Sequence, residues 1–149
     1  MFKKYIYLDN ASTTPLSKNV LNKINTTSKK YWSNSSSTYN SGIKSSTYLE
    51  KTRIKIAKLF NAEQEDIIFT SGASESTSIV FSNLGDKYKT GRVVISNVEH
   101  QATIISANKL KRKGWEICEL PVNKLGIINI LEFDEIIKNN TNLVYLIWG

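Results

Sequence analysis

The second half of the chain alternates short apolar runs with stretches of helical periodicity, and this alternation restricts the fold more than any other feature of the sequence. The apolar runs, which predict strands, are residues 67–70, 92–96, 115–119 and 143–148. The stretches between them, which predict helices, are about 75–84, 101–113 and 129–138. Strands that alternate with helices over short links indicate an α/β fold, with a mostly parallel sheet flanked by helices and right-handed crossovers.

The first half is helical in pattern and contains a polar loop. Thr14 and Pro15 are a favourable N-cap and first-turn pair, so we expect a helix to follow them. Its apolar face would carry Val20, Leu21, Ile24 and Tyr31.

A second helix is predicted from a capping box formed by Thr47 and Glu50. The polar stretch 33–38 between the two helical patterns reads as an ordered loop and not as a domain boundary. We therefore expect an N-terminal arm and loop over 1–15, helices and a polar loop over 16–62, and the α/β region over 63–149.

Composition and charge exclude several classes of function. The chain has 149 residues, a net charge of +7, one cysteine and one histidine. A single cysteine excludes an internal disulfide and a cysteine metal cage, so we predict no metal site. No run approaches the ~20 apolar residues that span a bilayer. The cations are scattered and mostly lysine, so we expect no nucleic-acid partner. We also expect no membrane association and a cytoplasmic location.

The segment from Phe69 to Ser76 joins a predicted strand to a predicted helix through small residues. Backbone N–H groups and the helix dipole converge at such a turn, which makes it a candidate anion site, typically for a phosphate. Ser74 and Ser76 add hydroxyl donors, and Gly72 allows close backbone approach. The local alternative is an ordinary strand-to-helix turn with a serine cap, and we expect Glu75 to cap the helix.

His100 lies just past the next predicted strand. Ligands bind at the carboxyl ends of the strands in parallel sheets, so the ring is placed to stack on a flat ligand or to move protons. A lone histidine more often has a structural role. His100, however, follows the serine-rich turn by one strand-helix unit and so falls on the same sheet edge, which favours a role in ligand binding or proton transfer.

Three segments together resemble the cysteine desulfurases, which belong to the class V aminotransferase group of pyridoxal-phosphate enzymes. They are Tyr7 to Pro15 (YLDNASTTP), Phe69 to Ser76 (FTSGASES) and Val98 to His100 (VEH). They occur in order and at matching spacing over nearly the whole chain. The resemblance implies the N-terminal portion of the type I pyridoxal-phosphate-dependent transferase fold, incomplete at its C-terminal end.

The resemblance also assigns site residues by position. Ala73 and Ser74 match the pair that holds the phosphate of pyridoxal 5'-phosphate, and His100 matches the histidine that stacks on the pyridine ring and assists proton transfer. The substrate-pocket loop corresponds to Asn10, Ala11, Ser12 and Thr13. The segment 33–42 resembles a family loop with departures: Ser33 stands for glycine, Ser35 for proline and Tyr39 for histidine.

Other family residues have no counterpart here. The Schiff-base lysine, the aspartate that pairs with the pyridinium nitrogen and the persulfide cysteine all lie beyond the matched region. We therefore expect residues 1–149 to form a single incomplete unit, with 63–149 as part of the cofactor-binding large domain. We also expect the chain alone to be inactive. Cys118 reads as a small buried apolar residue.

The reaction that the resemblance implies is removal of sulfur from L-cysteine, giving alanine and an enzyme persulfide. The implied partners are a second copy of the chain in a homodimer and sulfur-acceptor or scaffold proteins, in pathways such as iron-sulfur cluster assembly. Two alternatives stay open: another class V enzyme, such as an aminotransferase or lyase, and a non-catalytic product of a truncated or split gene.

The apolar run at 143–148 generates a prediction about solubility. Burying one large apolar side chain contributes ~1.5–3 kcal/mol, so loss of cover over several would consume much of the ~5–15 kcal/mol that keeps a domain folded. We expect the isolated chain to be poorly soluble or partly molten, and to become more soluble when the rest of a family member is co-expressed. A sharp cooperative thermal transition from a monodisperse monomer would contradict this expectation.

Overall fold

The structure, a computed structural model, describes residues 6–137 and 140–148. The chain divides into two compact units, Met1–Ile68 (unit 1) and Phe69–Gly149 (unit 2). Residues 1–5 of the arm and loop predicted over 1–15, and the predicted helix end at Lys138, lie outside the described residues. Within the described residues, no helix combines the length and the apolar character needed to cross a membrane.

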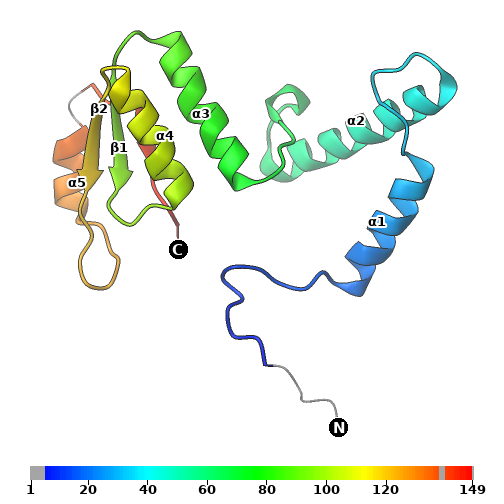
Figure 1. The fold of residues 1–149 in the computed structure, drawn as a ribbon, viewed down its shortest axis with the longest axis horizontal. Helices are drawn as coiled ribbons and strands as arrows, with labels where there is room; N and C mark the ends of the chain where they lie inside the picture. The colour runs from blue at the N-terminus through cyan, green and yellow to red at the C-terminus, as the bar shows by residue number, and fades with distance from the viewer. Residues whose placement is uncertain (1–5, 138–139, 149) are drawn as a thin grey trace. The chain divides into compact units, whose positions relative to one another are not determined.

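The first helix of unit 1, α1, spans Lys18–Lys30 and begins later than predicted (Figure 1). Its N-cap is Ser17, whose hydroxyl accepts a hydrogen bond from the N–H of Val20 at 3.4 Å. Serine caps a helix at least as well as threonine, so the cap falls at Ser17 and not at Thr14. Of the predicted apolar face, Val20, Leu21 and Ile24 lie on this helix and are exposed, whereas Tyr31 is its C-cap and is half-buried.

The second helix, α2, spans Asn40–Phe60 and is followed by a short 3-10 turn, η1, at Gln64–Asp66. The predicted start at a Thr47–Glu50 capping box is wrong, because Thr47 lies inside the helix and Glu50 pairs with Arg53 at 3.1 Å. The helix extends to Asn40 because Gly42 lets the polar loop approach its first turn. A Cβ at Gly42 would lie 2.5 Å from the carbonyl oxygen of Ser37.

Unit 2 contains a parallel sheet in the order β2-β1-β3, among the described residues. The strands are β1 (Arg92–Ser96), β2 (Glu116–Leu120) and β3 (Leu143–Tyr145). In the pairing register, Val94 lies opposite Cys118 on one side and Val144 on the other. The predicted parallel α/β architecture is confirmed.

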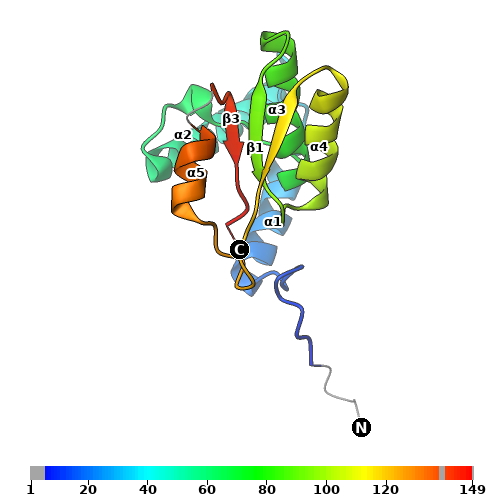
Figure 2. The same cartoon turned by 90° about the vertical axis from the view of Figure 1, so that its left-hand side faces the viewer.

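Helices cover both faces of this sheet. They are α3 (Ala73–Lys87), α4 (Gln101–Arg112) and α5 (Ile130–Ile137). Figures 1 and 2 show α3 and α4 on one side of the strands and α5 on the other. Strand β1 is buried from Val93 to Ser96 because it is paired along both edges and covered on both faces, as its apolar run requires.

The main core lies between β1 and the helices α3 and α4. Its buried members are Phe81, Val93, Ile95, Ala107, Leu110 and Trp115. Tyr145 of β3 packs against this cluster, and its hydroxyl lies 2.8 Å from that of Thr77 on α3. The packing is close at Gly91, where a Cβ would lie 2.6 Å from the ring of Trp115.

Two predicted strands differ from the structure. Residues 67–70 are not a strand and join none of the strands in the described sheet, and Ile68 is 68% exposed. An apolar run becomes a strand only when a neighbour accepts its hydrogen bonds. The run at 143–148 is a strand only as far as Tyr145, and Trp148 is fully exposed.

The core of unit 2 generates a prediction about stability. Phe81 is 2% exposed, whereas its neighbour Val80 on the same helix is 41% exposed. Replacing Phe81 with alanine should lower the free energy of unfolding of unit 2 by ~3–5 kcal/mol, because it leaves a cavity against β1.

Pulse proteolysis along a urea gradient measures this change at low protein concentration. Val80→Ala is the matched control and should cost under ~1 kcal/mol, since its side chain is already partly in water. Equal shifts in the two variants would contradict the assignment of the core.

Candidate active site

The serine-rich turn lies at the N-terminus of α3, where the helix presents unpaired backbone donors. Gly72 is the N-cap, and Ala73 and Ser74 are the first two helical residues. The first N–H groups of a helix have no partner within the helix, so those of Ala73 and Ser74 point out of its end. The positive end of the helix dipole coincides with these donors and favours a bound anion.

Glu75 was expected to cap this helix, and its side chain instead binds the turn that precedes the helix. Its carboxylate accepts a hydrogen bond at 2.5 Å from the backbone N–H of Ser71, which precedes the helix. That bond holds the pKa of Glu75 below its ordinary value. Glu75 therefore satisfies a donor outside the helix and leaves the N–H groups of Ala73 and Ser74 for a ligand.

The two serine hydroxyls of the turn have different surroundings. Ser76 Oγ lies 2.8 Å from Thr70 Oγ1 and 3.3 Å from the carbonyl oxygen of Gly72, so it is used inside the turn. The hydroxyl of Ser74 is exposed and makes no hydrogen bond with the described part of the chain. Of the two candidate hydroxyl donors, Ser74 is the one available to a ligand.

His100 is the N-cap of α4, directly after β1 and its connecting turn. Its Nδ1 accepts a hydrogen bond from the N–H of Ala102 at 3.1 Å. That bond requires an unprotonated Nδ1, so the neutral ring carries its proton on Nε2. The side chain is exposed, and the cap fixes the ring at the helix end while Nε2 remains available.

Glu99 is a buried carboxylate under this cap, and no sequence pattern assigned it a role. It is 7% exposed. Its Oε1 accepts from the hydroxyl of Ser96 and from the backbone N–H of Ile147, both at 2.7 Å. It therefore ties the end of β1 to the chain that follows β3. The signal in the sequence was a carboxylate directly after an apolar strand and directly before the capping histidine.

The predicted site residues are divided between the two units. Helices α3 and α4 both begin at the end of unit 2 toward which β1 and β2 point (Figure 1), so Ala73, Ser74 and His100 share that end. Asn10, Ala11, Ser12 and Thr13 belong to unit 1 and are exposed. There, Ser12 Oγ donates to Asp9 Oδ2 at 2.5 Å within a turn. The substrate-pocket role of these four residues stays a prediction.

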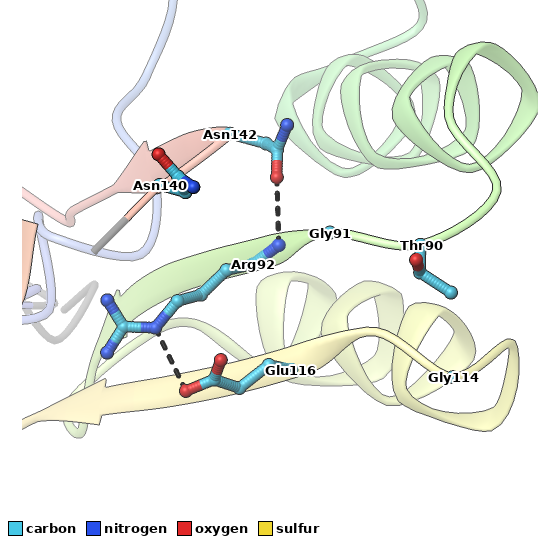
Figure 3. A pocket seen from close by; sticks show the side chains of 7 residues that line it. All are labelled: Thr90, Gly91, Arg92, Gly114, Glu116, Asn140 and Asn142. Carbon is cyan, nitrogen blue, oxygen red and sulfur yellow. Dashed lines mark hydrogen bonds and ion pairs between the residues drawn. The ribbon is translucent and has the colours of Figure 1, made fainter.

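A polar hollow of about 700 Å³ lies at the opposite end of the sheet (Figure 3). Arg92 crosses it and donates to Glu116 at 2.9 Å and to the carbonyl oxygen of Ile136. The backbone N–H of Arg92 donates to Asn142 Oδ1 at 2.9 Å. These bonds join β1 to β2 and to the start of β3, so we interpret the hollow as structural.

Cys118 lies in the middle of β2 and is half-buried, less than predicted. It is the only cysteine of the sequence. Across residues 6–137 and 140–148, no group of three histidine, cysteine or acidic side chains is placed to hold a metal ion.

Comparisons with known proteins give consistent results. Residues 6–149 match the family described as Aminotransferase class-V. Cysteine desulfurase IscS of Neisseria meningitidis (serogroup C / serotype 2a) is 34% identical over 150 residues, which cover 99% of this chain and 37% of the relative. Cysteine desulfurase of Rattus norvegicus is 34% identical over 142 residues, 93% of this chain and 32% of the relative.

Solved structures show the same likeness. A NifS-like protein superposes with a TM-score of 0.87 at 26% identity, covering 95% of this chain and 39% of that one. SspA in complex with cysteine superposes with a TM-score of 0.84 at 27% identity, covering 94% and 41%. The chain thus spans about a third of the length of the curated relatives it matches.

The contacts of Glu99 generate a prediction about local stability. Glu99→Ala removes the acceptor of the Ile147 N–H, and a hydrogen bond to a charged group contributes ~1.5–3 kcal/mol. The Ile147 amide should therefore exchange with solvent roughly 10- to 150-fold faster, as measured by hydrogen exchange.

Glu99→Gln keeps an acceptor oxygen and should have an intermediate effect. Glu119→Ala is the matched control, because Glu119 is an exposed carboxylate on β2. Unchanged exchange at Ile147 in Glu99→Ala, or an equal effect of Glu119→Ala, would overturn the proposed tie.

Proposed function

Because this chain belongs to the class V aminotransferase family, we propose that it supplies the phosphate-binding and ring-stacking part of a pyridoxal-phosphate-dependent cysteine desulfurase. Such an enzyme removes sulfur from L-cysteine and leaves alanine and an enzyme-bound persulfide. The observation that carries the proposal is the placement of open donors at the start of α3 and of His100 at the start of α4, at one end of unit 2.

The donor set at α3 fits a phosphate group. Two backbone N–H groups, the Ser74 hydroxyl and the helix dipole all favour an anion at the same point. The small side chain of Ala73 and the open space around Gly72, where a Cβ would meet nothing within 4 Å, leave room for it. When bound, pyridoxal phosphate supplies an electron sink for chemistry at the substrate's carbon atoms.

His100 fits the second role, which is to face the ring of the cofactor and hold a proton at Nε2. Because Nδ1 accepts in the helix cap, the ring can meet a bound molecule only through Nε2, whose N–H donates. Glu99, the residue before His100, accepts hydrogen bonds from Ser96 and Ile147 and so fixes the turn that leads to the His100 cap. The solved relative that contains cysteine supports L-cysteine as the substrate.

The remaining assignments belong to this proposal as well. Asn10, Ala11, Ser12 and Thr13 would line the substrate pocket, the working enzyme would be a cytoplasmic homodimer, and sulfur-acceptor or scaffold proteins would receive the sulfur. By its family resemblance, the lysine and cysteine that complete the reaction lie outside these 149 residues, so we expect no sulfide release from the chain alone.

The phosphate role generates a prediction with an internal control. We consider an enzyme in which residues 1–149 are joined to the remaining length of a related cysteine desulfurase. Ser74→Ala removes one hydroxyl donor to a charged group and should weaken the retention of pyridoxal phosphate roughly 10- to 150-fold. Absorbance of the bound cofactor during dialysis measures this retention without any turnover.

Ser76→Ala is the matched control for this experiment. Its hydroxyl is already used by Thr70 and Gly72, so retention of the cofactor should stay near that of the unaltered enzyme. Equal retention in Ser74→Ala and the unaltered enzyme would contradict the phosphate role of Ser74.

The proton-transfer role of His100 is tested by sulfide release from L-cysteine in the same completed enzyme. His100→Ala should lower turnover by ~10²- to 10⁴-fold, as is usual for loss of a general acid or base. Its cofactor retention should fall far less than that of Ser74→Ala. Full turnover without the imidazole would contradict this role, and absence of sulfide release from the unaltered completed enzyme would contradict the proposed function.

A further inference from the structure

Unit 1 contains a groove of about 470 Å³ between the end of α1 and the first half of α2, and none of the residues that line it is proposed for the reaction. We call it the lysine groove. Its lining is basic and aromatic: Lys30, Lys44 and Lys51 with Tyr31, Tyr48 and Ile43. None of its described lining residues is a carboxylate.

The positive charge of the lysine groove is not neutralised within the described residues. In that part of the chain, none of its three lysines has an ion-pair partner. The nearest acidic residue in sequence, Glu50, is held by Arg53 at 3.1 Å. Lys23 adds a further positive charge beside the groove. The hydroxyl of Thr27 and the ammonium group of Lys23 together hold the pKa of Tyr48 below its usual value, which places Lys23 close to that ring. Unneutralised like charges lining one groove favour an anionic partner.

The tyrosines argue against a nucleic acid as that partner. Tyr31 and Tyr48 stack on each other with ring centroids 4.1 Å apart and an angle of 12° between the rings. An ammonium group also lies over each ring, that of Lys30 at 5.3 Å from the centroid of Tyr31 and that of Lys23 at 5.8 Å from the centroid of Tyr48. Bases bind such proteins by stacking on free aromatic faces, and each of these rings already stacks on the other and has an ammonium group over it, which disfavours base stacking.

The spacing of the lysines fits an acidic peptide. Lys44 and Lys51 are seven residues apart on α2, which places them on one face about 10 Å apart along the axis. A peptide in the extended polyproline II conformation covers about 9 Å in three residues, and every third side chain lies on the same face, so two such carboxylates can reach both lysines. Ile43, which is 51% exposed beside Lys44, offers an apolar contact within the groove.

We propose that the lysine groove docks an acidic segment of a partner protein, with carboxylates about three residues apart in an extended stretch. The inference rests on unit 1 alone and does not depend on the function proposed for unit 2.

The probe is a fluorescent twelve-residue peptide with glutamate at every third position, titrated onto the full 149-residue chain carried on a solubility fusion. The fusion partner alone is the blank. The test variant is Lys44→Gln with Lys51→Gln. The control variant is Lys111→Gln with Lys124→Gln, two exposed lysines of unit 2, which removes the same charge. Far-ultraviolet circular dichroism checks that both variants keep their helices.

Saturable binding should weaken roughly 3- to 30-fold in the test variant and less than about twofold in the control variant, since each exposed ion pair contributes modestly. Three results would overturn the proposal: equal weakening in both variants, absence of saturable binding up to about 1 mM peptide, or tighter binding of a single-stranded RNA of equal charge that the test variant also weakens.

Discussion

The structure of unit 2 depends on the burial of strand β1. Val93, Val94 and Ile95 place apolar side chains on both faces of the strand, so exposure of either face to water would cost free energy. Both faces must therefore be covered, and both edges paired. Pairing with β2 and β3 satisfies the edges, and the helices cover the faces. The candidate site follows from this arrangement, because the turn that leaves β1 is held at a fixed sheet end by Glu99 and delivers His100 to the start of α4.

The elements that the sequence predicted well are those whose determinants are local. Strand β1 matches its predicted range, because its apolar run is bounded by Gly91 on one side and Asn97 on the other. The helix predicted from about residue 129 begins at Ile130, where the side chain of Asn129 accepts a hydrogen bond from the N–H of Leu131 at 3.1 Å. The start of α2 failed because it depends on Gly42 and the loop that packs on it, a tertiary contact that no capping pattern contains. The run at 67–70 failed because apolar character does not specify a strand partner.

The sequence predicted which residue types form the candidate site, but not which contact each of them makes. The sequence offered Ser74 and Ser76 as equivalent hydroxyls, and the structure separates them because Thr70 lies within reach of only one. It also placed Glu99 beside His100 without a function, since the partner of its carboxylate, the Ile147 N–H, lies far along the chain. A pattern reports such a contact only when both ends are close in sequence.

The tie between Glu99 and Ile147 has a consequence for the order of folding during synthesis. Strand β1 meets β2 soon after both emerge, since only α4 separates them, whereas the register of Val93 with Leu143 waits until α5 has also been made. Contacts that close long loops form late, and domains fold as the chain is produced. Until Ile147 has been synthesised, the carboxylate of Glu99 accepts a hydrogen bond from Ser96 alone. The turn that leads to His100 is then held by one contact fewer. Among the described residues, the sheet end that carries the candidate site is therefore completed after the pairing of β1 with β2.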